Sequence, residues 1–280
     1  MVAGAFAPAS REVTVAKTKL RLDALLVERG LFETRSRAAA AVLAGEVRVG
    51  EEVVAKPGQL VGGSSEIAVA ERPRFVSRGG VKLANAVAAS GVPVAGRRAL
   101  DVGASTGGFT DYLLGAGAEH VVALDVAYGQ LSWSLRQDPR VSVIERSNAR
   151  ALAPALLPYA PELIVADVSF ISLRTVLGPV LACAASRYDA LALVKPQFEV
   201  GRGGVGKGGV VRDGAARVGA LVAVGERALE LGASVLGYWT SGLPGPKGNR
   251  ETFIQLAEGG REGGLAAGEL ESAAAGADAT

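Results

Sequence analysis

The sequence predicts a doubly wound α/β fold with a mainly parallel sheet, preceded by a small α+β unit. From about residue 98 onward, short apolar runs alternate with helical patterns. This alternation is typical of a parallel sheet with helices on both faces. Before residue 70, two helical segments are followed by a strand pattern that alternates around a glycine. The chain has 280 residues and 49% hydrophobic residues, which allows two domains, each with its own core.

The small unit is predicted over residues 19–70. Leucines recur at helical spacing from Leu22, and Gly30 is a favourable residue to end that helix. Thr34 is a suitable N-cap for a second helix over 35–44. Valines alternate with charged residues over 46–54, which predicts a hairpin, and a further short strand is expected over 66–70.

Three segments are predicted to lie outside the two domains. Residues 1–18 are small, mixed and aperiodic, which predicts a flexible extension. Residues 71–76 carry charges and Pro73, as expected for a short linker. Residues 259–280 are a low-complexity run of Gly, Ala and Glu, which predicts a disordered tail. The larger domain is therefore expected over 77–258.

The larger domain is predicted to alternate strands and helices throughout its length. Ser77 is a candidate N-cap for its first helix. The expected strands are 98–102, 121–126, 141–145, 163–167, 191–195, about 234–238 and about 251–256. The expected helices are 78–89, 109–114, 130–137, 151–156, 173–185 and 215–231.

A glycine turn after the first strand is the clearest ligand-binding signal. In an open α/β sheet, ligands bind at the carboxyl ends of the strands, where this turn is expected. Its spacing is not G-x-G-x-x-G, which disfavours a dinucleotide. An acidic strand end and a looser turn suit a cationic nucleoside without phosphate, such as S-adenosylmethionine; a purely structural turn is the alternative. The residues in question are Asp101, Gly103, Ala104, Ser105, Thr106, Gly107, Gly108 and Phe109.

Polar residues at other strand ends are expected to face the same site. Asp125 is placed to accept hydrogen bonds from a ribose. Asn148 is placed to meet an adenine edge, or to serve in a turn. Asp167 follows the fourth strand, and Lys195 ends the apolar fifth strand. Burial disfavours a charged lysine, whereas a neighbouring Asp167 favours it; a lysine that reaches solvent by chance is the alternative.

Composition narrows the class of protein. The net charge is only +2, which by itself does not indicate a nucleic-acid partner. The single cysteine, Cys183, excludes an internal disulfide and is consistent with a cytoplasmic location. The single histidine, His120, is expected to be structural. No apolar run reaches membrane-spanning length, no signal-peptide pattern is present, and no cluster of metal ligands is visible.

The small unit resembles the S4 RNA-binding domain. The resemblance rests on Arg21-Leu-Asp-Ala-Leu-Leu-Val-Glu-Arg-Gly-Leu31, Thr34-Arg-Ser-Arg-Ala38 and Gly45-Glu-Val-Arg-Val49. Basic residues at the start of the second helix oppose the helix dipole, which also indicates a polyanionic partner, although a solvated face is the alternative. The candidate RNA-binding residues are Lys19, Arg21, Arg35, Arg37, Arg48 and Lys56, with Arg72, Arg74 and Arg78 in and after the linker.

Across residues 19–256 the chain resembles the TlyA family, which joins an S4 domain to an FtsJ-like, Rossmann-like class I methyltransferase domain. The matching motifs are Ser77-Arg-Gly-Gly-Val-Lys-Leu83, Asp101–Asp111 with its glycine turn, Asp125-Val-Ala-Tyr-Gly-Gln130, Asp167-Val-Ser-Phe-Ile-Ser172, Leu193-Val-Lys-Pro-Gln-Phe-Glu199 and Gly245-Pro-Lys-Gly-Asn-Arg-Glu251. The resemblance implies S-adenosylmethionine-dependent 2′-O-methylation of cytidines in ribosomal RNA, 16S, 23S or both. It places the family's catalytic set on Lys82, Asp167, Lys195 and Glu251.

The implied chemistry gives each of the four residues a role. A ribose 2′-hydroxyl is a weak nucleophile, so a lysine at 195 that is partly neutral is expected to take its proton. Lys82 is expected to stabilise the developing alkoxide, while Asp167 and Glu251 orient the lysines. Residues 201–209 lack the Ser or Thr of a phosphate-binding P-loop. They are interpreted as a lid in which Arg202 and Lys207 contact RNA phosphates, or as a floppy surface loop.

Two other functions are kept open from the sequence. The family also carries the label hemolysin, but the chain lacks a spanning segment and retains a complete cofactor turn. A ribosome-binding assembly factor without catalysis is the second alternative, which the intact set of four residues disfavours. The expected partners are ribosomal RNA and ribosomal subunits, and the expected state is a monomer.

Overall fold

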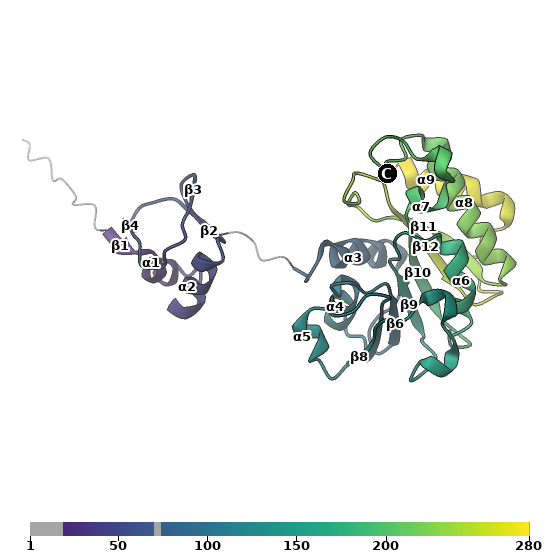
Figure 1. The fold of residues 1–280 in the computed structure, drawn as a ribbon, viewed down its shortest axis with the longest axis horizontal. Coiled ribbons are helices and arrows are strands. Elements are labelled where there is room, and N and C mark those ends of the chain that lie inside the picture. The colour runs from purple at the N-terminus through teal and green to yellow at the C-terminus, as the bar shows by residue number, and fades with distance from the viewer. Residues whose placement is uncertain (1–18, 70–73, 280) are drawn as a thin grey trace, which may run out of the picture. The chain divides into compact units, whose positions relative to one another are not determined.

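The computed structural model describes residues 19–69 and 74–279. The chain divides into two compact units, Met1–Arg72 and Pro73–Thr280, which are described separately (Figure 1). The predicted extension over 1–18 and residues 71–73 of the predicted linker, including Arg72, lie outside the described residues.

The smaller unit packs two helices on short strands. Its core contains Leu22, Leu26 and Val42, all fully buried. The Thr34 side chain accepts a hydrogen bond from the Arg37 amide, so the predicted N-cap of the second helix is formed. The short strand β4 was not expected from the sequence. The elements are β1 (Lys19–Arg21), α1 (Leu22–Glu28), α2 (Arg35–Leu43), β2 (Val47–Val49), β3 (Glu52–Val53), β4 (Leu60–Gly62) and β5 (Ile67–Val69), paired as β1–β4 and as β3–β2–β5.

The larger unit is built on a seven-stranded sheet in the order β11-β12-β10-β9-β6-β7-β8. Strands β10, β9, β6, β7 and β8 are parallel, whereas β12 runs antiparallel to both of its neighbours. The sheet is therefore doubly wound and mainly parallel, as predicted. Its strands are β6 (Arg98–Val102), β7 (His120–Leu124), β8 (Val141–Ile144), β9 (Leu163–Ala166), β10 (Asp189–Val194), β11 (Ser234–Thr240) and β12 (Thr252–Ala257).

Helices cover both faces of this sheet (Figure 1). Helices α3 and α4 enclose one core with Leu83, Leu113 and Phe253. Helices α6, α8 and α9 enclose the other, which includes Val224 and Leu270. The helices are α3 (Arg78–Ser90), α4 (Gly108–Gly115), α5 (Trp133–Arg136), α6 (Leu173–Leu181), α7 (Pro196–Glu199), α8 (Gly214–Glu230) and α9 (Leu270–Ala279).

The prediction of a helix over 151–156 is wrong. The chain instead forms two separate 3-10 turns, Ala149–Ala151 and Pro154–Leu156. Pro154 has no amide hydrogen, and it restricts the residue before it to extended backbone. Ala153 accordingly has a ψ of 151°, which prevents one continuous helix.

The prediction of a disordered tail is also wrong for residues 259–279. Helix α9 packs on the sheet face covered by α8, with Leu270 and Ala274 fully buried in that core. Gly225 of α8 makes this close approach feasible, because a Cβ there would lie 3.2 Å from a Leu270 methyl and 2.3 Å from the Tyr238 hydroxyl. A composition of Gly and Ala therefore reflects tight helix packing rather than disorder.

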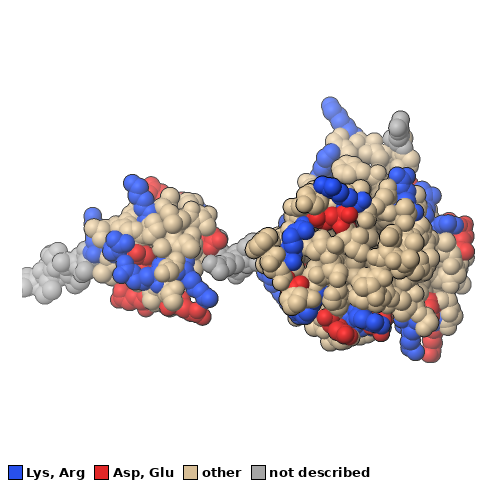
Figure 2. Space-filling model, turned by 60° about the horizontal axis from the view of Figure 1, so that its bottom comes forward, with Lys and Arg blue, Asp and Glu red and all other residues tan. Residues whose placement is uncertain are grey.

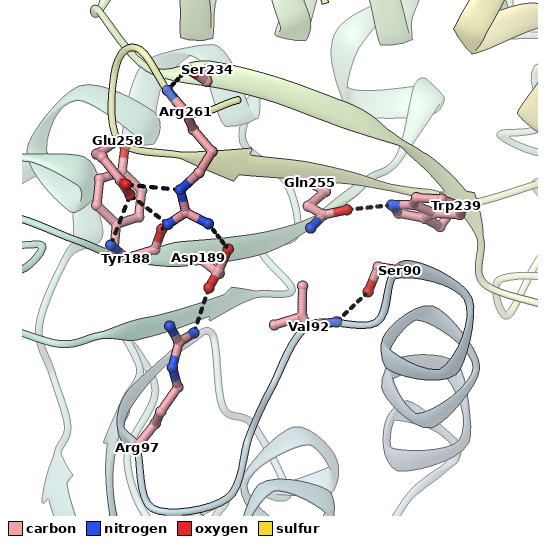
Figure 3. Close-up of polar contacts among 10 residues, drawn as sticks. All are labelled: Ser90, Val92, Arg97, Tyr188, Asp189, Ser234, Trp239, Gln255, Glu258 and Arg261. Atoms are coloured by element: carbon pink, nitrogen blue, oxygen red, sulfur yellow. Dashed lines mark hydrogen bonds and ion pairs between the residues drawn. The ribbon is translucent and has the colours of Figure 1, made fainter. Parts of the chain in front are cut away.

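A network of ion pairs closes the amino-terminal edge of the parallel strands (Figure 3). Asp189, 3% exposed at the start of β10, binds Arg97 at 2.6 Å and Arg261 at 3.2 Å. Arg261 also binds Glu258 at 2.7 Å, and Glu258 accepts from the Tyr188 amide. The arginine hydrogen bond is the main reason that the pKa of Glu258 falls to about 2. This edge lies opposite the carboxyl ends of the strands, so the network serves stability.

This network predicts an acid-dependent loss of stability. Glu258 has a lower pKa in the folded state than in the unfolded state, so its contribution is present above about pH 4.5. The contribution is lost as the pH falls toward 2. We expect Glu258→Gln to lower the free energy of unfolding at pH 7 by up to about 2 kcal/mol after solvent screening.

The measurement is denaturant unfolding of wild type and variant at pH 7 and pH 3, with Glu230→Gln as control. Glu230 forms an exposed ion pair with Arg227 and is expected to contribute little. Equal unfolding free energies of wild type and Glu258→Gln at pH 7 would contradict the prediction.

Candidate active site

Two adjoining cavities lie at the carboxyl ends of β6, β7, β9 and β10. The larger, of about 540 Å³, is lined by Asp125, Asn148 and Phe170, among others. The smaller, of about 290 Å³, is lined by Arg78, Lys82, Lys195 and Glu251, together with the glycine turn. Both cavities are lined by Gly103, Ser105, Asp167 and Ser169. The larger volume falls within the range of small-molecule sites, and the shared residues place the two cavities side by side.

The glycine turn after β6 has the geometry that its sequence predicts. Gly103 has a φ of +84°, and a Cβ there would lie 2.6 Å from the Asp167 carbonyl oxygen, so the turns after β6 and β9 approach closely. Gly107 has a φ of +97°, and a Cβ there would lie 2.3 Å from Leu135. Ala104, Ser105, Thr106, Gly108 and Phe109 line the smaller cavity with Gly103, whereas Gly107 faces the protein interior.

Asp101 does not line either cavity, contrary to its predicted role as a cofactor ligand. It is fully buried, and its Oδ2 accepts hydrogen bonds from the amide and the hydroxyl of Thr110. Burial raises its pKa to about 7. Asp101 thus fixes the first turn of α4 behind the glycine turn and does not itself face the cavity.

Asp125 and Asn148 both line the larger cavity, as their positions after β7 and β8 predict. The Asp125 carboxylate accepts from the Ser105 and Ala127 amides, both at 2.7 Å. It therefore also braces the glycine turn. The Asn148 Oδ1 accepts from the Arg150 amide and caps a 3-10 turn, so the predicted turn role is observed.

Lys195 and Asp167 form one of two lysine–carboxylate pairs at the smaller cavity. Lys195 Nζ lies 2.6 Å from Asp167 Oδ1 and donates to Ser169 Oγ at 2.7 Å. Lys195 follows β10 directly, where Pro196 begins α7, so the strand end fixes its backbone. Ser169 is a polar contact that the sequence analysis missed, and its position two residues after Asp167 was the available signal.

Lys82 and Glu251 form the second pair. Lys82 Nζ donates to Glu251 Oε2, and their side chains are 8% and 1% exposed. Lys82 comes from α3 and Glu251 from the residue before β12, so the pair joins segments far apart in sequence. Removal of either partner of such a buried pair is strongly destabilising, because it leaves the other charge buried and uncompensated. All four predicted catalytic residues thus meet at one cavity.

Phe170 is a second residue that the sequence analysis missed. It lines the larger cavity, yet its side chain is 92% exposed. Its φ of +62° is unusual for a residue other than glycine, and its ring lies 5.4 Å from that of Phe198. Strained backbone of this kind is found at ligand sites, where the surrounding structure holds it in place. An exposed ring at a cavity mouth provides a face on which a planar group can stack.

The glycine-rich loop over 201–209 is anchored at its end. Asn249, 2% exposed, donates to the Gly209 carbonyl and accepts from the Val211 amide. The Gly206 amide also donates to the Val210 carbonyl. Lys207 is exposed. These contacts hold the carboxyl end of the loop, and the lid, with a floppy surface loop as the alternative, stays a prediction.

Asp23 brings two of the predicted RNA-binding arginines together. It lies at the start of α1, and its carboxylate binds Arg21 at 2.9 Å and Arg35 at 3.1 Å. The hydrogen bond from Arg21 is the main reason that the pKa of Asp23 falls to about 2. Both arginine side chains remain more than half exposed. Figure 2 shows basic side chains gathered on one face of this unit.

The other predicted RNA-binding residues lie at separate positions. Lys19 and Lys56 are exposed, whereas Arg37 and Arg48 form exposed ion pairs with Glu33 and Glu51. In the larger unit, Arg74 lies over the ring of Phe75, and Arg78 lines the smaller cavity.

The Asp23 contacts predict a stability difference within the smaller unit. We expect Asp23→Ala to lower its free energy of unfolding at pH 7 by about 1–3 kcal/mol, since two charge-assisted hydrogen bonds are lost. Glu33→Ala, which removes an exposed ion pair, is the matched control and is expected to have little effect. The measurement is hydrogen exchange of α1 and α2 amides in the full chain; equal protection in both variants would contradict it.

Family models match both units of the chain. The FtsJ-like methyltransferase model matches residues 75–258, and the S4 domain model matches residues 20–67. A 16S/23S rRNA (cytidine-2′-O)-methyltransferase TlyA of Mycobacterium tuberculosis is 50% identical over 241 residues, covering 85% of this chain and 90% of the relative. The chain belongs to the TlyA family of FtsJ-like methyltransferases.

Other similar proteins carry a different name. A protein called Hemolysin A from Brachyspira hyodysenteriae is 38% identical over 234 residues, covering 83% of this chain and 97% of the relative. The solved structure of a protein described as a hemolysin from Streptococcus thermophilus is 38% identical, with a TM-score of 0.70, and covers 94% of this chain and 96% of that structure.

Membership confirms several predictions made from the sequence. The fold is that of a methyltransferase with an N-terminal S4 domain, the protein is an enzyme, and S-adenosylmethionine is its methyl donor. The roles of individual site residues, by contrast, rest on the geometry described above and are proposed below.

Proposed function

We propose that this chain methylates the 2′-hydroxyl of cytidine ribose in ribosomal RNA. The observation that carries the proposal is the meeting of Lys195–Asp167 and Lys82–Glu251 at one cavity, beside a second cavity of nucleoside size. The relatives named as rRNA (cytidine-2′-O)-methyltransferases support the substrate class. A serine, cysteine or metal-ligand set is not needed for this reaction, because the methyl donor is already activated.

The larger cavity suits the nucleoside part of S-adenosylmethionine, which supplies an electrophilic methyl group when bound. Asp125 keeps lone pairs for ribose hydroxyls beyond its two amide contacts. Asn148 keeps its amide NH₂ group for an adenine edge, since only its Oδ1 is used in the cap. The turn at Gly103 and Ser105 borders both cavities, so it is the segment that the donor's methionine part would follow.

Lys195 is assigned as the group that handles the 2′-hydroxyl proton. A charged lysine amine has three donor positions. The Lys195 amine donates one hydrogen bond to Ser169 Oγ and lies 2.6 Å from Asp167 Oδ1 in an ion pair. In its neutral form the Lys195 amine would accept the 2′-hydroxyl proton, while the bound donor would supply the methyl group by breaking its S–CH₃ bond and would leave as S-adenosylhomocysteine. Asp167 then stabilises the resulting ammonium ion.

Lys82 is assigned to the developing charge on the ribose oxygen. Its ammonium group is held by Glu251 in a nearly dry site, where electrostatic interactions are stronger than in water. Glu251 orients the Lys82 side chain through this ion pair. Lys82 and Lys195 therefore carry different tasks, one as a fixed cation and one as a proton acceptor.

The S4 unit is assigned to RNA binding. Its exposed arginines, two of them ordered by Asp23, suit phosphate contacts rather than a protein core. We infer that the substrate is RNA within ribosomal subunits, and that the chain acts on it as a cytoplasmic monomer. The two compact units, Met1–Arg72 and Pro73–Thr280, then act as separate domains, and helix α9 belongs to the second.

The test is transfer of tritium from labelled S-adenosylmethionine to isolated ribosomal subunits that lack the modification. We expect label in RNA, as 2′-O-methylcytidine after nuclease digestion. Background label with protein that binds the donor would overturn the proposal and favour an assembly factor without catalysis. Digestion of each labelled subunit would identify the nucleotide.

Membrane lysis is a second candidate only because of the name that some relatives carry. Within residues 19–69 and 74–279, every helix is too short or too polar to cross a bilayer. The discriminating experiment is dye release from liposomes by the pure protein. Release at the level of a known cytolysin would support this function, and retention of the dye would remove it.

A further inference from the structure

The segment that carries Glu251 is held at several points outside the cavity. The Glu251 carbonyl accepts from the Ser241 amide. A Cβ at Gly245 would lie 2.3 Å from Glu251 Oε1, so the turn before the segment covers the carboxylate closely. The position of the Lys82–Glu251 pair thus depends on how residues 245–251 are fixed.

Asn249 and Arg250 connect this segment to two other parts of the chain. The Asn249 side chain bonds the Gly209 carbonyl at 2.8 Å and the Val211 amide at 2.9 Å. The Arg250 guanidinium donates to the carbonyl oxygen of Asp278, in the last turn of α9. Hydrogen bonds therefore tie the two residues directly before Glu251 to the chain around Val211 and to the end of α9.

Asp278 and Arg217 join these two supports. Arg217, on α8, donates from Nε and Nη2 to the two Asp278 carboxylate oxygens, both at 2.7 Å. Its Nη1 donates to the Arg212 carbonyl at 2.8 Å. The two side chains are 15% and 11% exposed. A bidentate pair of this kind is geometrically specific. Asp278 therefore orients Arg217, which donates a hydrogen bond to the backbone next to Val211.

The docking of α9 does not itself require this ion pair. Ala274 and Leu270 are fully buried one and two turns before Asp278 in the helix, and they hold α9 on α8 by apolar contact. The Asp278 carboxylate adds a directed contact at the end of the helix that faces residues 249–251. Arg250, Glu251 and Asp278 also line one cavity of about 310 Å³, which confirms their proximity.

We propose that Asp278 is a positioning residue for the reaction: through Arg217 and the chain around Val211, it fixes the segment that presents Glu251 to Lys82. The proposal rests on the proposed methyl transfer, and it assigns to the C-terminal helix a role in catalysis. Asp278 itself touches neither substrate nor donor.

The test compares Asp278→Ala and Asp278→Asn with wild type in the full chain, by the tritium assay on ribosomal subunits. We expect kcat to fall about tenfold, with KM for RNA unchanged, because a displaced catalytic group costs rate rather than binding. Rates are expressed per donor-binding site, counted by calorimetry with S-adenosylhomocysteine. A partly unfolded variant loses sites and rate together, so its rate per site stays at the wild-type value.

Two further variants sharpen the outcome. Glu230→Ala removes an exposed ion pair at the end of α8 and is expected to keep the wild-type rate. Arg217→Ala is expected to lower the rate as much as Asp278→Ala does. The double variant is expected to be no slower than either single variant, since both changes remove the same contact. A wild-type rate per site in Asp278→Ala overturns the positioning role, as does a change confined to KM. An inactive wild type instead overturns the proposed function.

Discussion

Lys195→Ala is expected to lower kcat by at least about 100-fold, because general-base assistance to a weak hydroxyl nucleophile is lost. Donor binding is expected to stay unchanged, since Lys195 lines the smaller cavity and the nucleoside contacts lie in the larger one. The measurements are single-turnover methyl transfer and calorimetry with the donor.

Two variants control this prediction. Arg187→Ala removes an exposed positive charge before β10, the same strand that Lys195 follows, and is expected to be fully active. Lys195→Arg keeps the positive charge, but arginine stays protonated and cannot accept the hydroxyl proton. Substantial activity of Lys195→Arg would show that Lys195 acts only as a cation and would remove its role as base.

Glu251→Gln is expected to affect both stability and rate. Lys82 is then left as a buried cation without its anion, which is expected to cost about 3–5 kcal/mol of unfolding free energy. The rate is expected to fall by at least about 100-fold, because Lys82 loses its orientation. Denaturant unfolding and single-turnover transfer measure the two effects separately.

A paired substitution separates stability from catalysis at the same site. Lys82→Met with Glu251→Leu replaces both charges by apolar side chains of similar size, which is often neutral for stability. We expect the double variant to regain most of the unfolding free energy lost in Glu251→Gln while methyl transfer stays absent. Recovered activity in the double variant would show that the pair is structural only.

Local sequence patterns predicted most of the larger unit. The strand patterns around Leu100 and Val122 gave the sheet, because buried parallel strands need continuous apolar runs. They failed where tertiary packing decides the outcome. Pro154 divides a segment that looks helical by composition. Leu270 and Ala274 give α9 a helical contact face that low complexity concealed.

The sequence by itself determined the residue types of the site and their order along the chain. Asp125, Asp167 and Lys195 each end or follow a parallel strand, and such ends meet at one edge of a sheet. The prediction that Asp101 contacts the cofactor failed because its position at a strand end does not reveal which way its side chain faces. The side chain turns inward to Thr110 instead.

Only the tertiary structure decided which charges pair. Lys82 and Glu251 are separated by 169 positions, and their contact depends on α3 packing beside the strand pair β11–β12. The same holds for Asp278, whose carboxylate reaches Arg217 only because α9 docks on α8. Pairing between distant segments depends on the packing of whole helices, and no local pattern of residues encodes it.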